Sequence, residues 1–161
     1  MLHKSLHIST TGLVSLQSLD LGYNNISSID LDAFKYLKNL QTLILRRNSL
    51  TTIGAWTEPL LNLKILDISQ NLVVQLSETV HLNSVEKLNL ADNMLVDITS
   101  DNINKMSQVT QLDLSYNKLS RFPSLSSKVV ELFMSGNMIK TLDQSSLQGL
   151  SSIQVRSQQF L

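Results

Sequence analysis

The chain has 161 residues, of which 42% are hydrophobic, so it is long enough to form one domain with a continuous apolar core. Thirteen basic residues balance thirteen acidic ones, and a formal net charge of zero argues against a general attraction to nucleic acid or to an anionic membrane. Cysteine is absent, which excludes disulfides, thiolate catalysis and cysteine-ligated metal sites.

One pattern of apolar residues and an asparagine occurs six times along the chain. It reads apolar, two variable residues, apolar, one variable, apolar, two variable, asparagine, one variable, apolar. Recurrence at a period of roughly 20 to 24 residues is the sequence signature of stacked repeats. In chain order the copies are Leu16, Leu19, Leu21, Asn24, Ile26; Leu40, Leu43, Leu45, Asn48, Leu50; Leu63, Leu66, Ile68, Asn71, Val73; Val85, Leu88, Leu90, Asn93, Leu95; Val109, Leu112, Leu114, Asn117, Leu119; and Val129, Leu132, Met134, Asn137, Ile139.

The second and third apolar positions of each copy alternate with a variable residue, which is the period of a short strand with one buried face. Leu19 and Leu21 are therefore expected to point inward together. A single strand of this kind cannot bury its apolar face alone. Stacked copies form a parallel sheet with one unbroken core behind it, and each copy is stabilised by its neighbours.

The asparagine of each copy is expected to lie in a turn that folds inward, where buried backbone groups need hydrogen-bond partners. Its amide both donates and accepts, so asparagines in register predict a ladder that links adjacent copies. A leucine in this position would leave backbone groups unpaired at roughly 1 to 3 kcal/mol each. The predicted ladder consists of Asn24, Asn48, Asn71, Asn93, Asn117 and Asn137, all expected to be buried.

Apolar residues also recur on the return path of each copy and are expected to close the core. Five residues after the asparagines lie Ile29, Ile53, Leu76, Ile98, Phe122 and Leu142. Three residues before the copies lie Leu13, Leu37, Leu60, Leu82, Met106 and Leu150, a series that Ser126 interrupts. Trp56 is expected to fill the convex part of the core, and the segments starting at Asp32 and Asp101 have spacing compatible with one helical or 3₁₀ turn.

The predicted fold is an α/β solenoid of about six to seven coils, with a parallel concave sheet and a mostly irregular or 3₁₀ convex side. Residues 1–161 form a single repeat domain, in which 1–12 are an N-terminal partial repeat or cap and 13–150 contain the six repeats. Residues 151–161 are expected to form a degenerate C-terminal repeat, because Arg156 stands where a buried leucine belongs.

From Leu13 to Leu150 the chain resembles the leucine-rich repeat superfamily. The segment Asp32-Ala-Phe-Lys-Tyr-Leu-Lys-Asn-Leu is similar to the outer part of typical extracellular repeats. The mixture of repeat lengths is similar to Toll-like receptor and insect secreted immune ectodomains. This resemblance implies an extracellular or cell-surface glycoprotein that recognises a protein or microbial ligand on the concave sheet or a flank, often after forming a homo- or heterodimer.

The lack of cysteine departs from that pattern, because extracellular members usually flank their repeats with cysteine-bonded caps. The alternative hypothesis is a cytoplasmic repeat protein that acts as a scaffold, an enzyme inhibitor or a regulatory subunit. A third is an auxiliary segment of a larger enzyme. No catalytic residues, cofactor site or metal site are predicted, since His3, His7 and His81 lack the partners that such sites need. We expect no nucleic-acid partner and no membrane-spanning segment.

Candidate binding residues are the outward positions of the strands, which can vary without harm to the core. A central column reads Asp20, Ile44, Asp67, Asn89, Asp113 and Phe133, and a column beside the asparagines reads Tyr23, Arg47, Gln70, Asp92, Tyr116 and Gly136. From these columns and Arg46 we select Tyr23, Ile44, Arg46, Arg47, Asp67, Asp113, Tyr116 and Phe133 as candidate partner-binding residues.

Each candidate also has a purely structural interpretation. Exposed Ile44 and Phe133 are suited to anchor a partner, although scattered apolar surface residues are common. Arg46 and Arg47 either recognise an acidic partner or pair internally with aspartates of the neighbouring copies, and internal pairing is favoured. The tyrosines either bind a partner or pack on their own turns. Asn25, in the sequence Asn25-Ile-Ser, is a candidate glycosylation site if the chain is secreted.

Overall fold

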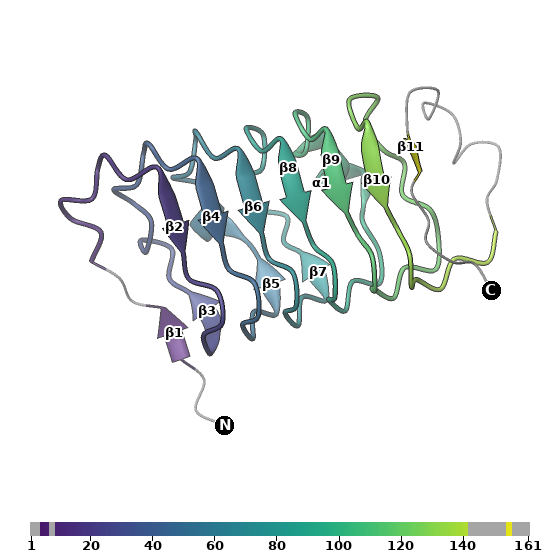
Figure 1. Cartoon of the computed structure of the whole chain (residues 1–161), viewed down its shortest axis with the longest axis horizontal. Helices are drawn as coiled ribbons and strands as arrows, with labels where there is room; N and C mark the ends of the chain where they lie inside the picture. Colours follow the sequence, from purple (N-terminus) through teal and green to yellow (C-terminus); the bar gives the residue numbers. More distant parts are fainter. Residues whose placement is uncertain (1–3, 7–8, 142–153, 156–161) are drawn as a thin grey trace.

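The computed structural model describes residues 4–6, 9–141 and 154–155, which form a curved solenoid (Figure 1). Its main sheet has seven parallel strands in the spatial order β11-β10-β9-β8-β6-β4-β2. The strands are β2 (Ser18–Asp20), β4 (Thr42–Ile44), β6 (Ile65–Asp67), β8 (Lys87–Asn89), β9 (Gln111–Asp113), β10 (Glu131–Phe133) and β11 (Gln154–Val155). We number the coils by the six copies of the repeat, so coil 1 contains β2 and Asn24, and coil 6 contains β10 and Asn137.

The six repeats stack without any shift in register. The central leucines of neighbouring strands lie opposite one another, beginning with Leu19 beside Leu43 and Leu43 beside Leu66. Leu43 and Leu66 are fully buried, whereas their sequence neighbours on the strands face outward. The alternation in the sequence therefore places one leucine of each strand in the shared core, which confirms the predicted parallel solenoid.

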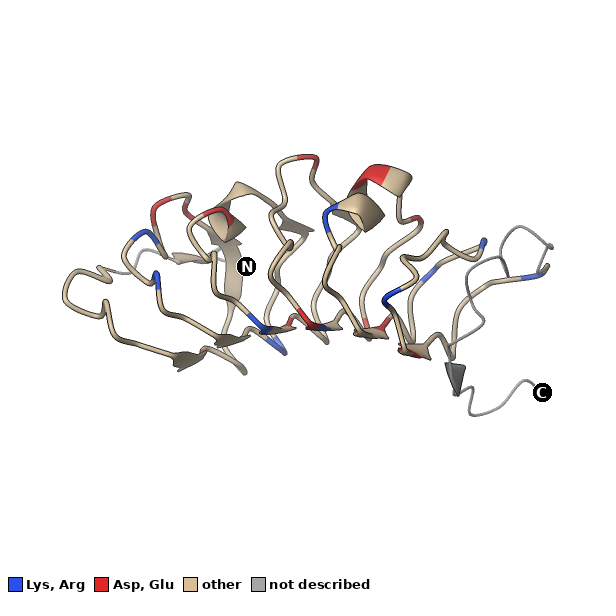
Figure 2. Cartoon of the chain, turned by 90° about the horizontal axis from the view of Figure 1, so that it is seen from above, with Lys and Arg blue, Asp and Glu red and all other residues tan. Residues whose placement is uncertain are grey.

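Figure 2 shows that the main sheet lines the inner side of the arc, with the return segments on the outside. The outer side contains the 3₁₀ helix η1 (Ala55–Thr57) and the short helix α1 (Ser100–Asn104). The Thr99 hydroxyl accepts a hydrogen bond from the Asn102 backbone, and the Asn102 side chain accepts one from the Thr99 backbone, so a capping box starts α1. The sequence predicts one helical or 3₁₀ turn in each of two segments, and α1 confirms it for the segment that contains Asp101. The segment that starts at Asp32 forms turns without a helix.

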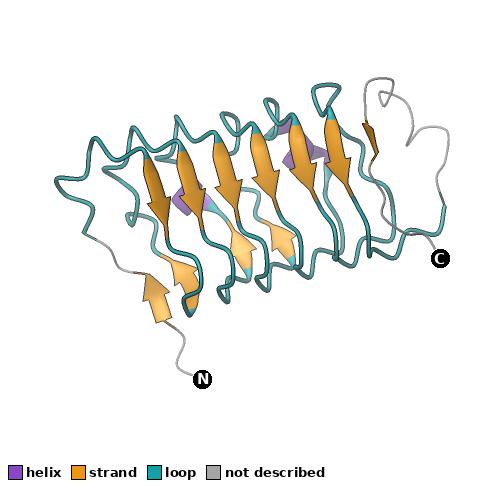
Figure 3. Cartoon of the chain, in the orientation of Figure 1, coloured by secondary structure: helices purple, strands orange, loops and turns teal. Residues whose placement is uncertain are grey.

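The return path also contains two small parallel sheets that the repeat pattern did not predict (Figure 3). One pairs β1 (Lys4–Leu6) with β3 (Ile26–Ile29), and the other pairs β5 (Thr52–Ile53) with β7 (Gln75–Leu76). The ladders are only two to four residues long. In these segments the repeat pattern has one recurring apolar residue per coil, such as Ile29, Ile53 and Leu76, so it contains no alternation that would distinguish a strand from irregular chain.

Trp56 fills the outer part of the core, as predicted. Its side chain is 4% exposed, and its ring meets the ring of Phe34 edge to face, with centroids 5.8 Å apart. This arrangement is favoured for aromatic pairs because the positive ring edge faces the negative ring face. The two rings belong to neighbouring coils, so they join coils 1 and 2 on the outer side.

Coil 1 is more open than the sequence pattern predicts. Leu13, expected in the core, is 44% exposed, while its counterpart Leu37 in coil 2 is fully buried. Leu16, Leu19 and Leu21 are half-buried and pack on the core from one side. The expected burial of Leu13 is therefore wrong, because among the described residues no main-sheet strand lies beyond β2 to cover it.

Candidate functional site

Hydrogen bonds of the repeat asparagines hold the strands of the concave face in place. The amide nitrogen of Asn71 donates to the carbonyls of Ile68 and Ser69 in its own coil and of Leu45 in the previous coil, at 3.0, 3.2 and 3.0 Å. Its amide oxygen accepts from the backbone nitrogen of Leu50 at 3.0 Å. The same links between coils are made by Asn48, Asn93, Asn117 and Asn137.

Asn24 does not link two coils, and its expected burial is wrong; Asn137 makes the links but is only half-buried. The Asn24 side chain is exposed, and its amide nitrogen donates only within its own turn, to the carbonyls of Leu21 and Gly22 at 3.0 Å each. An asparagine is buried in this ladder only where a preceding coil lies over it. In the part of the chain that the structure describes, coil 1 has no such neighbour in the main sheet.

The residue before each asparagine has a left-handed backbone. The φ angles lie between 53° and 57° for Tyr23, Arg47, Gln70, Asp92 and Tyr116, and φ is 69° for Gly136. Residues with a side chain rarely adopt this conformation, which costs about 1 kcal/mol or more. The repeat pattern places these residues in one column but does not indicate their conformation, for which the glycine at position 136 is the one signal in the sequence.

The central column is aligned in the structure, with Ile44 beside Asp20 and Asp67, and Phe133 beside Asp113. Its polar members have a structural role that the sequence analysis did not assign. In each of them, a side-chain oxygen accepts a hydrogen bond from the backbone nitrogen two residues later, as in an Asx turn. The donors are Gly22, Ser69, Ala91 and Ser115, at 2.8, 2.9, 3.0 and 2.9 Å.

Ile44 and Phe133 are the two members of this column that lack such a bond, and both are half-buried. They line opposite ends of a shallow hollow on the concave face, which extends over β4, β6, β8, β9 and β10. Ile65 also faces this hollow and is 37% exposed, although it is not among the residues that the outward columns predict. Lys87 and Asn89 lie between the apolar residues, so the floor of the hollow combines apolar and polar groups.

Tyr23, Arg46 and Arg47 come together at the rim of coils 1 and 2. The guanidinium carbons of Arg46 and Arg47 lie 4.9 and 5.1 Å from the centroid of the Tyr23 ring, within the range of a cation–π contact. The Arg47 Nε donates to the Gln70 Oε1 at 2.7 Å. The favoured expectation that both arginines pair with neighbouring aspartates is wrong, because within the described residues neither forms an ion pair.

Tyr116 has the same place in coil 5 but a different neighbour. A Cβ atom added to Gly136 would lie 2.5 Å from the Cδ1 atom of the Tyr116 ring, so the ring rests on the backbone of coil 6. Both tyrosines remain 60% exposed. Tyr116 therefore packs on the next turn of the solenoid, while the Tyr23 ring packs against two charged side chains.

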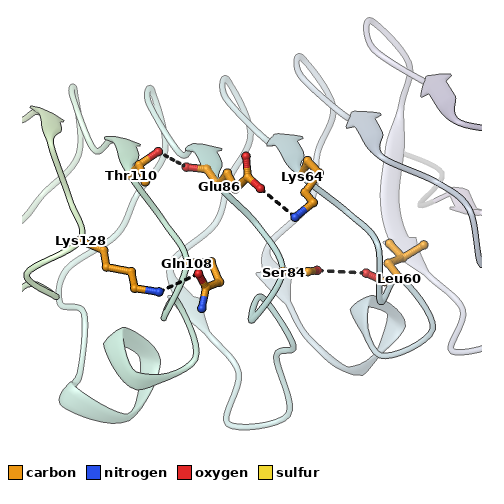
Figure 4. A network of polar contacts seen from close by, with 7 residues as sticks. All are labelled: Leu60, Lys64, Ser84, Glu86, Gln108, Thr110 and Lys128. Carbon is orange, nitrogen blue, oxygen red and sulfur yellow. Dashed lines mark hydrogen bonds and ion pairs between the residues drawn. The ribbon is translucent and has the colours of Figure 1, made fainter.

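Polar contacts also connect the coils at the edge of the sheet where the strands begin (Figure 4). Lys64 pairs with Glu86 at 2.7 Å, and the Thr110 hydroxyl donates to the backbone carbonyl of Glu86 at 3.2 Å. Lys128 donates to the Gln108 side chain at 2.7 Å. Half-exposed pairs of this kind contribute little to stability, about 1 kcal/mol or less. They satisfy the charges along this edge from within the solenoid.

The described residues contain no group of three or more histidine, aspartate or glutamate side chains placed to hold a metal ion. The His81 ring meets the carbonyl of Thr79 through Nδ1 at 2.9 Å. His3 and His7 lie outside the described residues. Within the part of the chain that is described, no helix has the length and apolarity needed to cross a bilayer.

Comparison with known proteins identifies the repeats. The family model described as leucine rich repeat matches residues 14–73. Tsukushi from Gallus gallus is 30% identical over 151 residues, covering 88% of this chain and 40% of the relative. Toll-like receptor 2 from Equus caballus is 38% identical over 147 residues, covering 83% of this chain and 18% of the receptor. The chain thus spans less than half the length of these relatives.

Solved structures show the same architecture. A crystal structure of a TLR13–ssRNA13 complex superimposes with a TM-score of 0.83 and 27% identity, covering 91% of this chain and 22% of that one. A leucine-rich repeat protein of Leptospira interrogans has a TM-score of 0.77 at 24% identity, covering 90% of this chain and 38% of that one, and shows the fold alone. Because the first structure contains RNA, the expectation that nucleic acid is not a partner has no support from these neighbours.

Proposed function

Because the chain is a leucine-rich repeat protein, similar to parts of Toll-like receptor 2 and Tsukushi, we propose that it is a recognition module that binds a protein or microbial ligand. Binding, rather than catalysis, is the function that its surface supports. The proposal extends to a place in an extracellular receptor or a secreted innate-immune protein, with the concave sheet as the working face. A homo- or heterodimer is compatible with this role.

The hollow of the concave face is the observation that carries the proposal. Ile44 and Ile65 lie on adjacent strands at one end, and Phe133 lies at the other, with polar side chains between them. Apolar anchors surrounded by polar groups are the usual composition of a protein-binding surface. From Ile44 to Phe133 the hollow extends over four strand spacings, about 19 Å, a span suited to an extended segment of a partner.

Partner capture by crosslinking in the native tissue or cell tests this proposal. The variants Ile44→Asp and Phe133→Ala, both on the concave face, should each weaken capture of the partner. Leu31→Asp is a matched control, because Leu31 is 66% exposed but lies after β3, away from the main sheet. If Leu31→Asp abolishes capture and the concave variants do not, the working surface is not the concave sheet.

The absence of cysteine favours a second candidate, a cytoplasmic scaffold or enzyme inhibitor that uses the same surface. Asn25 distinguishes the two, since the sequon is glycosylated only in a secreted chain. The Asn25 side chain is exposed and accessible to modification. Secretion with an added mass that Asn25→Gln removes supports the extracellular role. Retention in the cytosol together with capture of an enzyme supports the second candidate.

A further inference from the structure

We propose that the cluster of Tyr23, Arg46, Arg47 and Gln70 binds a short acidic segment of a protein partner. This rim cluster lies beside the concave sheet, at coils 1 to 3, and would bind one end of the partner segment that occupies the hollow. The inference rests on the proposed function, because it names the chemistry of the partner that the recognition module takes.

The two guanidinium groups are already held in place. Both lie about 5 Å from the centroid of one tyrosine ring, and Gln70 fixes the Nε of Arg47 at 2.7 Å. Long cationic side chains usually lose considerable conformational freedom when they bind an anion. Here the two side chains are already ordered before the anion binds, so less conformational entropy is lost on binding. Planar guanidinium groups also match the two oxygens of a carboxylate, which an ammonium group does not.

The rim cluster holds two arginines without an ion pair. Three exposed basic residues of the described chain do form ion pairs, namely Lys35 with Asp32, Lys64 with Glu86, and Arg121 with Asp97, while single lysines such as Lys38 and Lys118 do not. Arg46 and Arg47 have no carboxylate within ion-pair distance in the same set of residues, although they are adjacent in sequence and share one ring. Two like charges held together on the surface are best stabilised by an anion from outside.

The position of Arg46 depends on a small residue in the neighbouring coil. Arg46 is the second residue after its strand. The residues at the same position in the other coils are small, namely Gly22, Ser69, Ala91, Ser115 and Ser135. A Cβ atom at Gly22 would lie 3.2 Å from the Cγ atom of Arg46 and 3.4 Å from its carbonyl oxygen. Because Gly22 has no side chain, the Arg46 side chain of coil 2 has room to extend over coil 1 to the Tyr23 ring.

The charge of the adjoining surface selects a short acidic peptide over a nucleic acid. Asp67, Asp92 and Asp113 follow along the concave face and its rim in coils 3 to 5. A polyanion that extends from the rim cluster along the sheet would meet these carboxylates and be repelled. A protein segment with two or three acidic residues at one end, and neutral or basic residues in the rest, complements both halves of the surface.

The experiment measures binding of a fluorescent peptide, Gly-Ser-Glu-Glu-Glu-Glu-Ser-Gly, to the full chain, with the same peptide carrying glutamines as a control. Arg46→Gln combined with Arg47→Gln should weaken binding of the acidic peptide about tenfold. Lys118→Gln combined with Arg121→Gln removes the same charge from exposed residues of coil 5 and should leave binding unchanged. Circular dichroism shows whether each variant is folded, and Arg46→Lys with Arg47→Lys, which keeps both charges, should weaken binding by a smaller factor.

Equal binding of the two peptides, or equal losses in the two double variants, would overturn the acidic-segment site. Binding of an oligouridylate that requires Arg46 and Arg47, with no binding of the acidic peptide, would assign the cluster to nucleic acid instead. Failure of the proposed function has a different signature. If a native partner is captured and its binding does not depend on Arg46 and Arg47, only the acidic-segment site is overturned. If the acidic peptide binds but no partner can be captured, the recognition role is overturned and the acidic-segment site is still supported.

Discussion

Coil 1 and coil 3 carry the same repeat pattern but differ in how completely they are closed. In coil 3, Leu66 and Ile68 are fully buried and Asn71 is 5% exposed. In coil 1, the equivalent Leu19 is half-buried, and Asn24 is exposed. Coil 3 lies between two other coils of the main sheet, whereas among the described residues no main-sheet strand precedes β2 of coil 1, which has only the pairing of β1 with β3 on the return path.

The difference shows that the repeat pattern determines which way a side chain points, whereas the neighbouring coils determine how deeply that side chain is buried. Each leucine faces inward because of its place in its own strand. The energy gained from that placement depends on what lies on both sides, since a solenoid is stabilised by interfaces between adjacent coils. Matched substitutions in coils 1 and 3 therefore measure the contribution of the second interface.

The largest difference is expected for the central leucines. Leu66→Ala should lower the free energy of unfolding by about 4 kcal/mol, because it leaves a cavity inside a packed core. Leu19→Ala should cost about 1 kcal/mol, since the side chain is half-buried and packs on the core from one side. Urea unfolding of the two variants measures both values. Equal losses would mean that coil 1 is as closed as coil 3.

The ladder asparagines should give the next largest difference. Asn71→Leu removes three donated bonds and one accepted bond, and buried carbonyls lose their partners, so we expect a loss of about 3 kcal/mol. Asn24→Leu should cost less than about 1 kcal/mol, because Asn24 is exposed and bonds only within its turn.

Gln70→Ala is the internal control for this comparison, since Gln70 precedes Asn71 but is exposed and lies outside the ladder. It should change the unfolding temperature little. If Asn71→Leu and Gln70→Ala shift the unfolding temperature equally, the ladder does not contribute to stability in the manner that its hydrogen bonds indicate.

A third comparison concerns the contact between coils 5 and 6, where the Tyr116 ring lies against Gly136. Gly136→Ala should cost about 2 kcal/mol, because the backbone is left-handed at φ 69° and the new Cβ would collide with the Tyr116 ring. Gly54→Ala should cost less, since its nearest neighbour would be 3.5 Å away. Adding Tyr116→Ala to Gly136→Ala should recover part of the loss in chemical denaturation. No recovery would show that the ring does not rest on this backbone.

Much of the fold was predictable because a single period encodes it. The leucine alternation predicted the strands, the inward residues and the parallel register, and Trp56 was placed correctly in the core. The repeat pattern does not predict the small sheets β1–β3 and β5–β7, since it has only one recurring apolar residue per coil on the return path and therefore no alternation there. Leu13 and Asn24 were placed wrongly because a repeat pattern does not state whether a coil has a neighbour on both sides.

The candidate site was less predictable, because outward residues are free of the constraint that creates the pattern. The columns themselves followed from the strand period and are aligned in the structure. The partners of the side chains did not follow. Asp67 accepts hydrogen bonds from its own turn, and Arg46 extends to the Tyr23 ring of the neighbouring coil. Both contacts depend on the three-dimensional arrangement of the residues, which the repeat pattern does not contain.

The smallest expected difference concerns Asp20 and Asp67, two of the three aspartates of the central column. Asp67 accepts from both the backbone nitrogen and the hydroxyl of Ser69, at 2.9 and 2.7 Å, and Ser69 is 8% exposed. Asp20 is exposed and accepts from the Gly22 backbone at 2.8 Å. Asp67→Ala should therefore lower stability by about 1 kcal/mol, and Asp20→Ala by about half of that.

Asp67→Asn separates the hydrogen bonds of this turn from the charge of the side chain. It keeps an acceptor oxygen for Ser69 and removes the negative charge, so its unfolding temperature should stay close to that of the unaltered chain. If Asp67→Asn destabilises as much as Asp67→Ala, the charge rather than the turn is the stabilising feature. Coil 3 would then differ from coil 1 in its electrostatics, and the closed Asx turn would no longer account for the difference between Asp67 and Asp20.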